Sequence, residues 1–291
     1  MPIAPFAATH RMPTTAEDLA IVHRALEEDA PTGDLTSELV VPRASRCTAD
    51  LIAKEAGVLA GTSVARAVFD VTAEQDDTDV EQDWRAGDGE TLTLGTVIAT
   101  FHGPFRTILR AERPAINLLA HLSGIATLTR RFVDAAAPAQ VLCTRKTLPG
   151  LRSLERAAVA AGGGSLHRAS LSDAVLIKDN HLRAAGGVVE AVRSAKTHGI
   201  PVEVEVETME QLEQALEAGA DRILLDNPTP ALVREAVARV GDALRLEISG
   251  GVTLDTVGEL VNAGARVVSV GRLTHSAPSL DISLEVTDVG R

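Results

Sequence analysis

The chain has 291 residues, of which 45% are apolar, and can bury one barrel-sized domain with a smaller one, or two ordinary domains. Its net charge of −12 argues against nucleic acid or an anionic membrane as the main partner. Two cysteines are too few for a disulfide framework, so a reducing, cytoplasmic location is expected. No run reaches about 18 apolar residues, and we see no signal-peptide pattern, so no membrane span is expected.

The N-terminal stretch predicts one capped helix after a loose lead-in. Residues 1–14 are rich in Pro and Ala and are expected to form that lead-in. Thr15 can cap a helix that runs to about Glu28, with Asp18 three residues on as in a capping box.

The next hundred residues predict a β-rich unit and then a long helical segment. Residues 47–105 alternate short apolar runs, such as AVFDV at 67–71, with glycines, and residues 76–89 are interpreted as a surface loop. Residues 106–136 have helical spacing of apolar side chains. Pro114 lies inside this pattern, so we expect a kink or a break there.

After Pro138 the chain repeats a strand–helix pattern. Apolar runs interpreted as strands lie at 141–145, 174–178, 202–206, 222–226, 244–249 and 267–271. Helical patterns separate the last four of these strands, at 208–219, 229–241 and 254–264. Such alternation is typical of parallel strands joined by right-handed crossovers, and it favours a closed or partly open barrel over a flat sheet. The final segment SLDISLEV alternates and is expected to rejoin the N-terminal unit as an antiparallel strand.

Positive charge is concentrated in one part of this acidic chain. Residues 106–181 carry eleven Lys or Arg and five Asp or Glu, a net charge of +6, which leaves −18 for the rest. Within it, Arg145 and Lys178 each follow an apolar run that is expected to be a strand. A local positive cluster of this kind is typical of a site for a small polyanionic ligand.

The expected barrel strands all end on a polar residue or a glycine. In chain order these ends are Arg145 with Lys146, Lys178, Glu205 with Glu207, Asp226, Ser249 and Gly271. Ligands of parallel α/β folds bind at the carboxyl ends of the strands. The pattern therefore predicts a binding site at that mouth of the barrel.

The VEVEVE run at 202–207 predicts carboxylates inside the barrel, because its valines must face the covering helices. Buried carboxylates need partners. One interpretation is an ion-pair network with Lys146 and Lys178. The other is that Glu205 and Asp226 hold a divalent cation or sugar hydroxyls, and oxygen ligands of this kind suit Mg²⁺.

Two glycine turns predict phosphate binding. Ser249, Gly250 and Gly251 end one strand just before a helix that Thr253 can cap, and Gly271 ends the next strand. Such turns expose backbone N–H groups to a phosphate. The alternative is that they are only tight turns.

Histidines near the positive cluster are candidates for ligand contacts. His167 and Arg168 follow three glycines at 162–164, and this position favours binding over a purely structural role. His181 and His275 are equally compatible with capping a loop and with touching a ligand.

Taken together, these motifs resemble the quinolinate phosphoribosyltransferase family. The matching segments cover nearly the whole chain in order: ALEEDAPTGDLTS (25–37), KEAGVLAG (54–61), AERPAINLLAHLSGIAT (111–127), TRKTLPGLR (144–152), GGGSLHR (162–168), DAVLIKDNH (173–181), VEVEVE (202–207), ILLDN (223–227), EISGG (247–251) and VGRLTHS (270–276). Pro114, Cys143 and Leu166 depart from the commonest form of these motifs.

The resemblance implies an α/β fold with two domains and a specific reaction. It implies an N-terminal α/β sandwich domain at 1–120, joined by about 277–291, and an incomplete, open α/β barrel at 121–276. It also implies a homodimer with shared active sites. The implied reaction joins quinolinate to phosphoribosyl pyrophosphate, with Mg²⁺, and gives nicotinate mononucleotide, pyrophosphate and CO₂ for NAD biosynthesis.

The resemblance also implies roles for individual residues. The groups implied to hold the quinolinate carboxylates are Arg145, His167, Arg168 and Lys178, with Arg113 of the partner subunit. The groups implied to bind phosphates are Lys146, Lys178, Ser249, Gly250, Gly251 and Gly271, with His275 nearby. Those implied to bind ribose hydroxyls and metal are Glu205 and Asp226. The residues interpreted as catalytic, as electrostatic stabilisers and not as nucleophiles, are Lys146, Lys178, Glu205 and Asp226.

Three alternatives remain open from the sequence. The first is a related protein on the same scaffold, either an enzyme that acts on another pyridine acid or the molybdenum-operon protein of unknown substrate. The second is a Schiff-base aldolase that uses Lys178. The third is a non-catalytic protein that binds a phosphosugar.

Overall fold

The computed structural model describes residues 15–290, so the expected lead-in at 1–14 lies outside the described residues. The chain forms two compact units. The first contains residues up to Leu128, Leu148–Gly163 and residues from Ser276 onward, and the second contains Thr129–Thr147 and Gly164–His275. The sequence had placed 148–163 in the barrel domain. The helix α4 (Phe105–Ala136) passes through the predicted boundary after residue 120, and that boundary stays a prediction.

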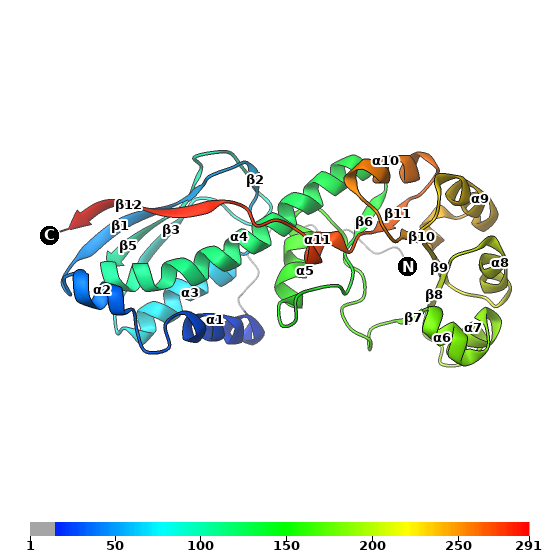
Figure 1. Cartoon of the computed structure of the whole chain (residues 1–291), viewed down its shortest axis with the longest axis horizontal. Coiled ribbons are helices and arrows are strands. Elements are labelled where there is room, and N and C mark those ends of the chain that lie inside the picture. The colour runs from blue at the N-terminus through cyan, green and yellow to red at the C-terminus, as the bar shows by residue number, and fades with distance from the viewer. Residues whose placement is uncertain (1–14, 291) are drawn as a thin grey trace. The chain divides into compact units, whose positions relative to one another are not determined.

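The first unit is built on an antiparallel sheet in the order β12-β1-β5-β3 (Figure 1). Its strands are β1 (Arg46–Ala53), β3 (Glu81–Trp84), β5 (Val97–Pro104) and β12 (Ile282–Gly290). Side chains of β1 alternate between buried and more exposed, as expected for a sheet with one covered face. The pairing of β12 with β1 confirms that the C-terminal segment returns to this unit as an antiparallel strand. A short second sheet pairs β2 (Gly57–Val58) with β4 (Thr91–Leu92).

The helices of this unit include the capped helix that the sequence predicts. They are α1 (Ala16–Asp29), α2 (Leu35–Val40), α3 (Thr62–Gln75), α5 (Arg152–Ala161) and most of α4. The Thr15 hydroxyl accepts a hydrogen bond from the Asp18 N–H at 3.1 Å, and the Asp18 carboxylate accepts one from the Thr15 N–H at 2.9 Å. This reciprocal pair is the expected capping box.

Two expectations for residues 47–105 were wrong. The AVFDV run at 67–71 lies in α3 and not in a strand, and β3 lies inside the expected loop at 76–89. A short apolar run does not distinguish a strand from a buried helix. On α3 the buried side chains recur at helical spacing, and Phe69 stacks on Phe101 of β5 with ring centroids 4.0 Å apart.

The expected break at Pro114 was also wrong, because α4 runs through it without interruption. An interior proline costs a helix about 3 kcal/mol or more. Burial of one large aliphatic side chain contributes roughly 1.5–3 kcal/mol. On α4 the side chains of Ile108, Leu119, Leu122 and Ile125 are at most 2% exposed. Their combined burial outweighs the cost of the proline.

The second unit contains an open parallel sheet in the order β6-β11-β10-β9-β8-β7. Its strands are β6 (Gln140–Leu142), β7 (Val175–Ile177), β8 (Val202–Val206), β9 (Arg222–Asp226), β10 (Leu246–Ser249) and β11 (Val267–Ser269). Its helices are α6 (Asp179–Ala185), α7 (Val188–Lys196), α8 (Met209–Glu217), α9 (Pro230–Val240), α10 (Leu254–Asn262) and α11 (Arg272–His275), with a 3-10 turn at Ala243–Arg245. Among the described residues β6 and β7 do not pair with each other, which confirms the incomplete α/β barrel.

The register of the parallel strands decides which side chains face the interior. Glu203 pairs with Arg222, and Glu205 pairs with Leu224, which in turn pairs with Glu247. Side chains that pair across a parallel ladder share one face, and successive residues alternate. The valines of β8 are at most 1% exposed and face the other side, where α7 and α8 contact the strand (Figure 1). The glutamates of this strand therefore point into the barrel, as the sequence predicts.

Candidate functional site

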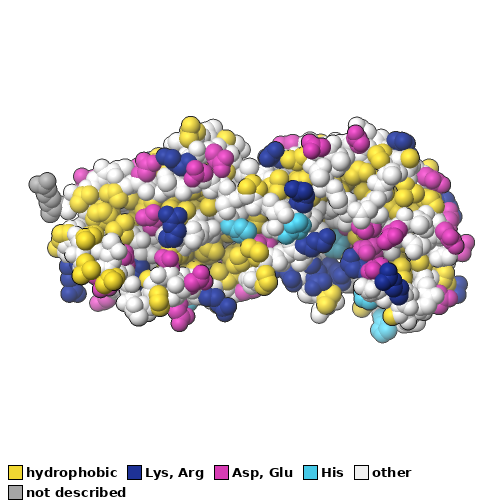
Figure 2. All heavy atoms as spheres, viewed as in Figure 1, with side chains coloured by type: hydrophobic (Ala, Val, Ile, Leu, Met, Phe, Trp, Pro, Cys, Tyr) yellow, Lys and Arg dark blue, Asp and Glu magenta, His cyan; other side chains and the backbone are white. Residues whose placement is uncertain are grey.

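The structure brings most of the predicted site residues to the carboxyl ends of the second unit's strands. Those that follow or end a strand are Arg145, Lys146, Lys178, Glu205, Asp226, Ser249 and Gly271. Lys and Arg side chains gather near α11 in Figure 2. Arg113 is the exception, because it lies on α4 in the first unit, with a side chain 60% exposed and 3.7 Å from the Glu112 carboxylate.

Arg145 and Arg168 form a pair of like charges with unsatisfied donors. The Nε atoms of both side chains are buried, and neither has a hydrogen-bond partner among the described residues. Burial, followed by the nearby Arg145 charge, holds the pKa of Arg168 below its usual range. Arg168 donates one hydrogen bond, from Nη1 to the Ala174 carbonyl at 3.1 Å. Buried unpaired guanidinium donors are costly, and a carboxylate is the group that satisfies them best.

Lys178 pairs with Glu205 across neighbouring strands. The Lys178 ammonium donates to the Glu205 carboxylate, and the two side chains are 44% and 16% exposed. No carboxylate of residues 15–290 lies within ion-pair distance of Lys146, so the ion-pair network forms with one of the two expected lysines. His181 caps the chain here, because its Nδ1 accepts a hydrogen bond from the Lys178 N–H at 2.9 Å.

Asp226 lies against the glycine turn that follows β10. A Cβ added to Gly250 would lie 2.4 Å from Asn227 Oδ1 and 2.6 Å from Asp226 Oδ1, so no other residue fits. The Asn227 amide donates to Asp226 at 2.7 Å, and its backbone N–H donates to the Ser249 carbonyl at 2.8 Å. The turn therefore fixes the Asp226 carboxylate beside the exposed backbone of Gly251.

The turn that follows β11, the last strand of this sheet, lies against Lys146. The Thr274 hydroxyl donates to the Lys146 carbonyl at 2.7 Å. A Cβ on Gly271 would lie 3.0 Å from Lys146 Cδ and 3.2 Å from His275 Nε2. Gly271 thus lets the chain approach the Lys146 and His275 side chains, as expected for a turn that serves a phosphate.

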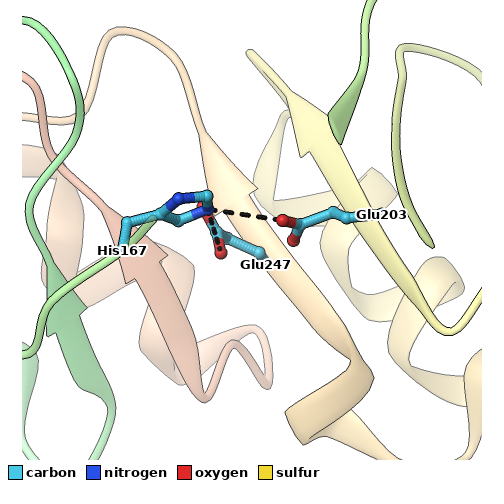
Figure 3. A group of neighbouring side chains, drawn as sticks. All are labelled: His167, Glu203 and Glu247. Carbon is cyan, nitrogen blue, oxygen red and sulfur yellow. Dashed lines mark ion pairs between the residues drawn. The ribbon is translucent and has the colours of Figure 1, made fainter. Parts of the chain in front are cut away.

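His167 does not point to the mouth but joins a deeper set of charges, here called the inner charged layer: His167, Glu203, Arg222 and Glu247. Figure 3 shows His167 directed at the carboxylates of Glu203 and Glu247. His167 Nε2 lies 3.3 Å from Glu203 Oε2 and 3.6 Å from Glu247 Oε2. Arg222 contacts the same carboxylates, with Nε 3.5 Å from Glu203 and Nη2 3.2 Å from Glu247. Glu247 is fully buried.

The inner charged layer shifts two pKa values. Burial lowers the pKa of His167, but the hydrogen bonds to Glu203 and Glu247 outweigh it and raise the pKa to about 9. Burial raises the pKa of Glu247, but the His167 contact outweighs it and holds that pKa below its usual value. The Arg168 N–H donates to His167 Nδ1 at 2.8 Å and opposes a second proton on the ring, because Nδ1 must keep its lone pair to accept. Nε2 carries a proton in both the neutral and the positively charged ring.

Sequence reasoning missed Arg222 and Glu247 as members of this layer. The signal for Glu247 was present, because it alternates with the buried Leu246 and Ile248 as Glu203 does with its valines. That alternation gives the face of a residue. It does not give the partner, which only the register provides.

A cavity of about 300 Å³ lies beside β7. Its wall is mainly apolar, and Arg168 is its only member among the residues expected to bind substrate. Its lining residues are Arg168, Leu171, Ser172, Ala174, Val175, Leu176, His181 and Ile200. The other expected ligand groups therefore lie outside this cavity. No helix in the described part of the chain has the length and apolarity needed to cross a membrane.

Comparison with known proteins identifies the family. The models described as Quinolinate phosphoribosyl transferase, N-terminal domain and C-terminal domain match residues 34–123 and 125–285. The chain is 43% identical over 265 residues to the "Probable nicotinate-nucleotide pyrophosphorylase (carboxylating)" of Bacillus subtilis (strain 168), with 89% of this chain and 90% of that protein covered. It is 41% identical over 274 residues to the "Nicotinate-nucleotide pyrophosphorylase (carboxylating)" of Mycobacterium leprae (strain TN), with 91% and 95% covered.

Solved structures agree. The nicotinate-nucleotide pyrophosphorylase from Francisella tularensis superposes with a TM-score of 0.87 at 35% identity, over 95% of this chain and 98% of that one. The two family models together match most of the chain, and the two bacterial relatives named above exceed 40% identity over about nine-tenths of it. The chain belongs to the quinolinate phosphoribosyl transferase family.

Proposed function

We propose that this protein transfers the phosphoribosyl group of phosphoribosyl pyrophosphate to quinolinate and releases CO₂. The products are nicotinate mononucleotide and pyrophosphate, a step of NAD biosynthesis. The names of the relatives support this reaction. The observation that carries it is the pair of guanidinium groups of Arg145 and Arg168, whose buried Nε donors have no partner among the described residues. A pyridine dicarboxylate supplies the anionic acceptors that these donors need.

The proposed quinolinate site lies at the ends of β6 and β7. Arg145, Arg168 and Lys178 bind the carboxylates, and Arg113 of the partner subunit completes the site. His167 supports this site from inside the barrel, where its Nε2 faces the carboxylates of Glu203 and Glu247. This division assigns direct contacts to the arginines and a supporting role to the histidine.

The proposed donor site lies at the ends of β8 to β11. Lys146 and His275 neutralise phosphate charge beside Gly271, and Ser249, Gly250 and Gly251 present backbone N–H groups to phosphate oxygens. Glu205 and Asp226 bind the ribose hydroxyls. Two phosphorylated and carboxylated substrates require a preorganised cationic site of this kind.

Glu205 and Asp226 also fit a magnesium ion. The strand register places both side chains on the interior face, and carboxylate oxygens are ligands that Mg²⁺ prefers. We propose that these two residues hold the ion together with donor phosphates. Mg²⁺ bound there would neutralise charge that develops on the departing pyrophosphate.

The chemistry follows from electrostatics. As the bond from the ribose carbon to pyrophosphate breaks and the bond to the pyridine nitrogen forms, the sugar acquires oxocarbenium character. The carboxylates of Glu205 and Asp226 stabilise that positive charge. The ring nitrogen is then cationic, so its charge stabilises the electron pair that the departing CO₂ leaves on the adjacent ring carbon, and this carbon takes up a proton from solvent. Lys178 and Arg145 stabilise the charge that develops, and no nucleophilic side chain is required.

We further propose a homodimer with shared sites and a cytoplasmic location. The dimer accounts for Arg113. This residue belongs to the first compact unit, whereas the other proposed site residues belong to the second. Cys47 and Cys143 are buried and form no disulfide, as expected for a reducing compartment.

An assay of both products tests the reaction. Purified protein with Mg²⁺ and phosphoribosyl pyrophosphate should release CO₂ and pyrophosphate in equal amounts from quinolinate. Nicotinate has one carboxylate fewer and should support little turnover. Turnover of nicotinate at the rate of quinolinate would refute the proposed specificity, and release of neither product would refute the reaction.

A further inference from the structure

The imidazole of His167 connects the buried carboxylates to the main chain at Arg168. On one side Nε2 lies 3.3 Å from Glu203 and 3.6 Å from Glu247 (Figure 3). On the other side Nδ1 accepts the Arg168 N–H at 2.8 Å. The next side chain is the Arg168 guanidinium, whose Nε is buried without a hydrogen-bond partner among the described residues. The ring therefore lies between the interior of the barrel and a group proposed to bind quinolinate.

Glu247 is the most constrained member of this arrangement. Its side chain has no solvent exposure, and it receives contacts from His167 above and from Arg222 on the neighbouring strand. A buried carboxylate held between a histidine and an arginine cannot shift without displacing them, so it is suited to fix the orientation of a ring.

The proton on His167 Nε2 and the position of Arg222 argue for this role over metal binding. His167, Glu203 and Glu247 place one potential ligand atom each within 4.8 Å of one another, as a metal site would. Arg222, however, already contacts both carboxylates. Because Nδ1 accepts the Arg168 N–H, Nε2 carries the ring proton and offers the carboxylates a donor and not a ligand atom.

We propose that Glu247 is a positioning residue for quinolinate binding, which acts by holding the His167 Nε2–H and so fixing Arg168 at the mouth. This inference rests on the proposed function. Glu203 shares the contact from β8, Arg222 faces both carboxylates from β9, and Arg145 adds positive charge beside Arg168. Loss of the Glu247 charge should therefore weaken the hold on His167 while the other partners remain.

Glu247→Gln is the direct test, because it keeps the volume and removes the charge. In ¹⁵N-histidine NMR of the substrate-free protein, His167 should lose its second proton at a lower pH in the variant than in the wild type. The KM for quinolinate should rise about tenfold or more, since the His167 ring loses one of the two carboxylates that hold it. The KM for phosphoribosyl pyrophosphate should change less than the KM for quinolinate. The quinolinate KM should also increase with pH earlier than in the wild type.

Two further variants separate this role from a structural one. Arg222→Gln with Glu247→Gln keeps the net charge of the layer, so it should fold even if the single variant does not. It should show the quinolinate defect, with a smaller histidine shift than Glu247→Gln, because loss of the arginine charge raises the histidine pKa. Glu213→Gln removes an exposed carboxylate that pairs with Arg239 in the same unit, and it should change neither readout.

Clear outcomes would overturn the proposal. A folded Glu247→Gln or double variant with an unchanged quinolinate KM would do so, as would equal losses for both substrates. Loss of the His167 Nε2–H signal on addition of Zn²⁺ alone would favour a metal site instead. If the wild type releases no CO₂ from quinolinate, the proposed function fails, and the histidine titration still tests the contact between Glu247 and His167.

Discussion

Gly250→Ala should damage the donor site by a route whose size the structure allows us to work out. Gly250 has φ +86°, and left-handed backbone costs a residue with a Cβ roughly 1–2 kcal/mol. The new Cβ would also lie 2.4 Å from Asn227 Oδ1 and 2.6 Å from Asp226 Oδ1. Overpacking of this kind costs typically about 1–3 kcal/mol. We therefore expect the free energy of unfolding to fall by about 2–5 kcal/mol.

The same contact predicts the effect on activity. Relief of the overlap must move Asp226 or Asn227, because the backbone of the turn is tied to Asn227 by its hydrogen bond to the Ser249 carbonyl. Displacement of a positioned catalytic group by about 1 Å can cost about a hundredfold in rate. We expect at least a tenfold loss of kcat/KM for phosphoribosyl pyrophosphate and a smaller change in the KM for quinolinate.

Gly219→Ala is the matched control. Gly219 has φ +82°, and nothing lies within 4 Å of the Cβ that would be added. It therefore carries the backbone cost without the contact, and its expected loss is about 1–2 kcal/mol with normal kinetics. Urea unfolding and steady-state kinetics measure both effects. If Gly250→Ala were no less stable than Gly219→Ala and kept its kinetics, the reasoning about Asp226 would be wrong.

Three other predictions use the same assays. Lys146→Ala should reduce turnover by at least about a hundredfold. It should leave the unfolding free energy within about 0.5 kcal/mol, because this exposed lysine makes no ion pair among the described residues. Near-normal turnover would remove Lys146 from the site. Mixing Arg113→Ala subunits with Lys178→Ala subunits should restore part of the activity that each variant lacks. If verified mixed dimers showed no recovery, Arg113 would serve the site of its own subunit. The raised pKa of His167, about 9 against about 6.5 in an unfolded chain, means that the folded state binds more protons between these values. The stability that His167 contributes should be fully present below pH 6.5 and should decrease as pH rises to about 9. If the stability of the wild type depended on pH in this window no more than that of His167→Gln, the raised pKa would be contradicted.

The sequence predicted the barrel more closely than the first unit. The strand bounds 202–206 and 222–226 agree with β8 and β9 residue for residue, because alternation and flanking helices mark them clearly. The AVFDV run was misassigned to a strand, and α3 packs it as a helix. Short apolar runs carry no period long enough to decide between the two.

For the candidate site, the sequence determined which residue types stand at the strand ends. Parallel strands joined by crossovers must bring those ends together, so Arg145, Lys178 and Asp226 could be placed at one mouth before any coordinates. The uninterrupted passage of α4 through Pro114 could not be predicted, because it depends on apolar burial along the whole helix.

Only the tertiary structure decided which charged groups are partners. Lys178 contacts Glu205, while His167 turns inward to Glu203 and Glu247. These contacts join residues from 27 to 80 positions apart in the chain. Spacing along one strand gives the face of a side chain, but the partner on the next strand is set by register and by how deeply each side chain reaches into the barrel.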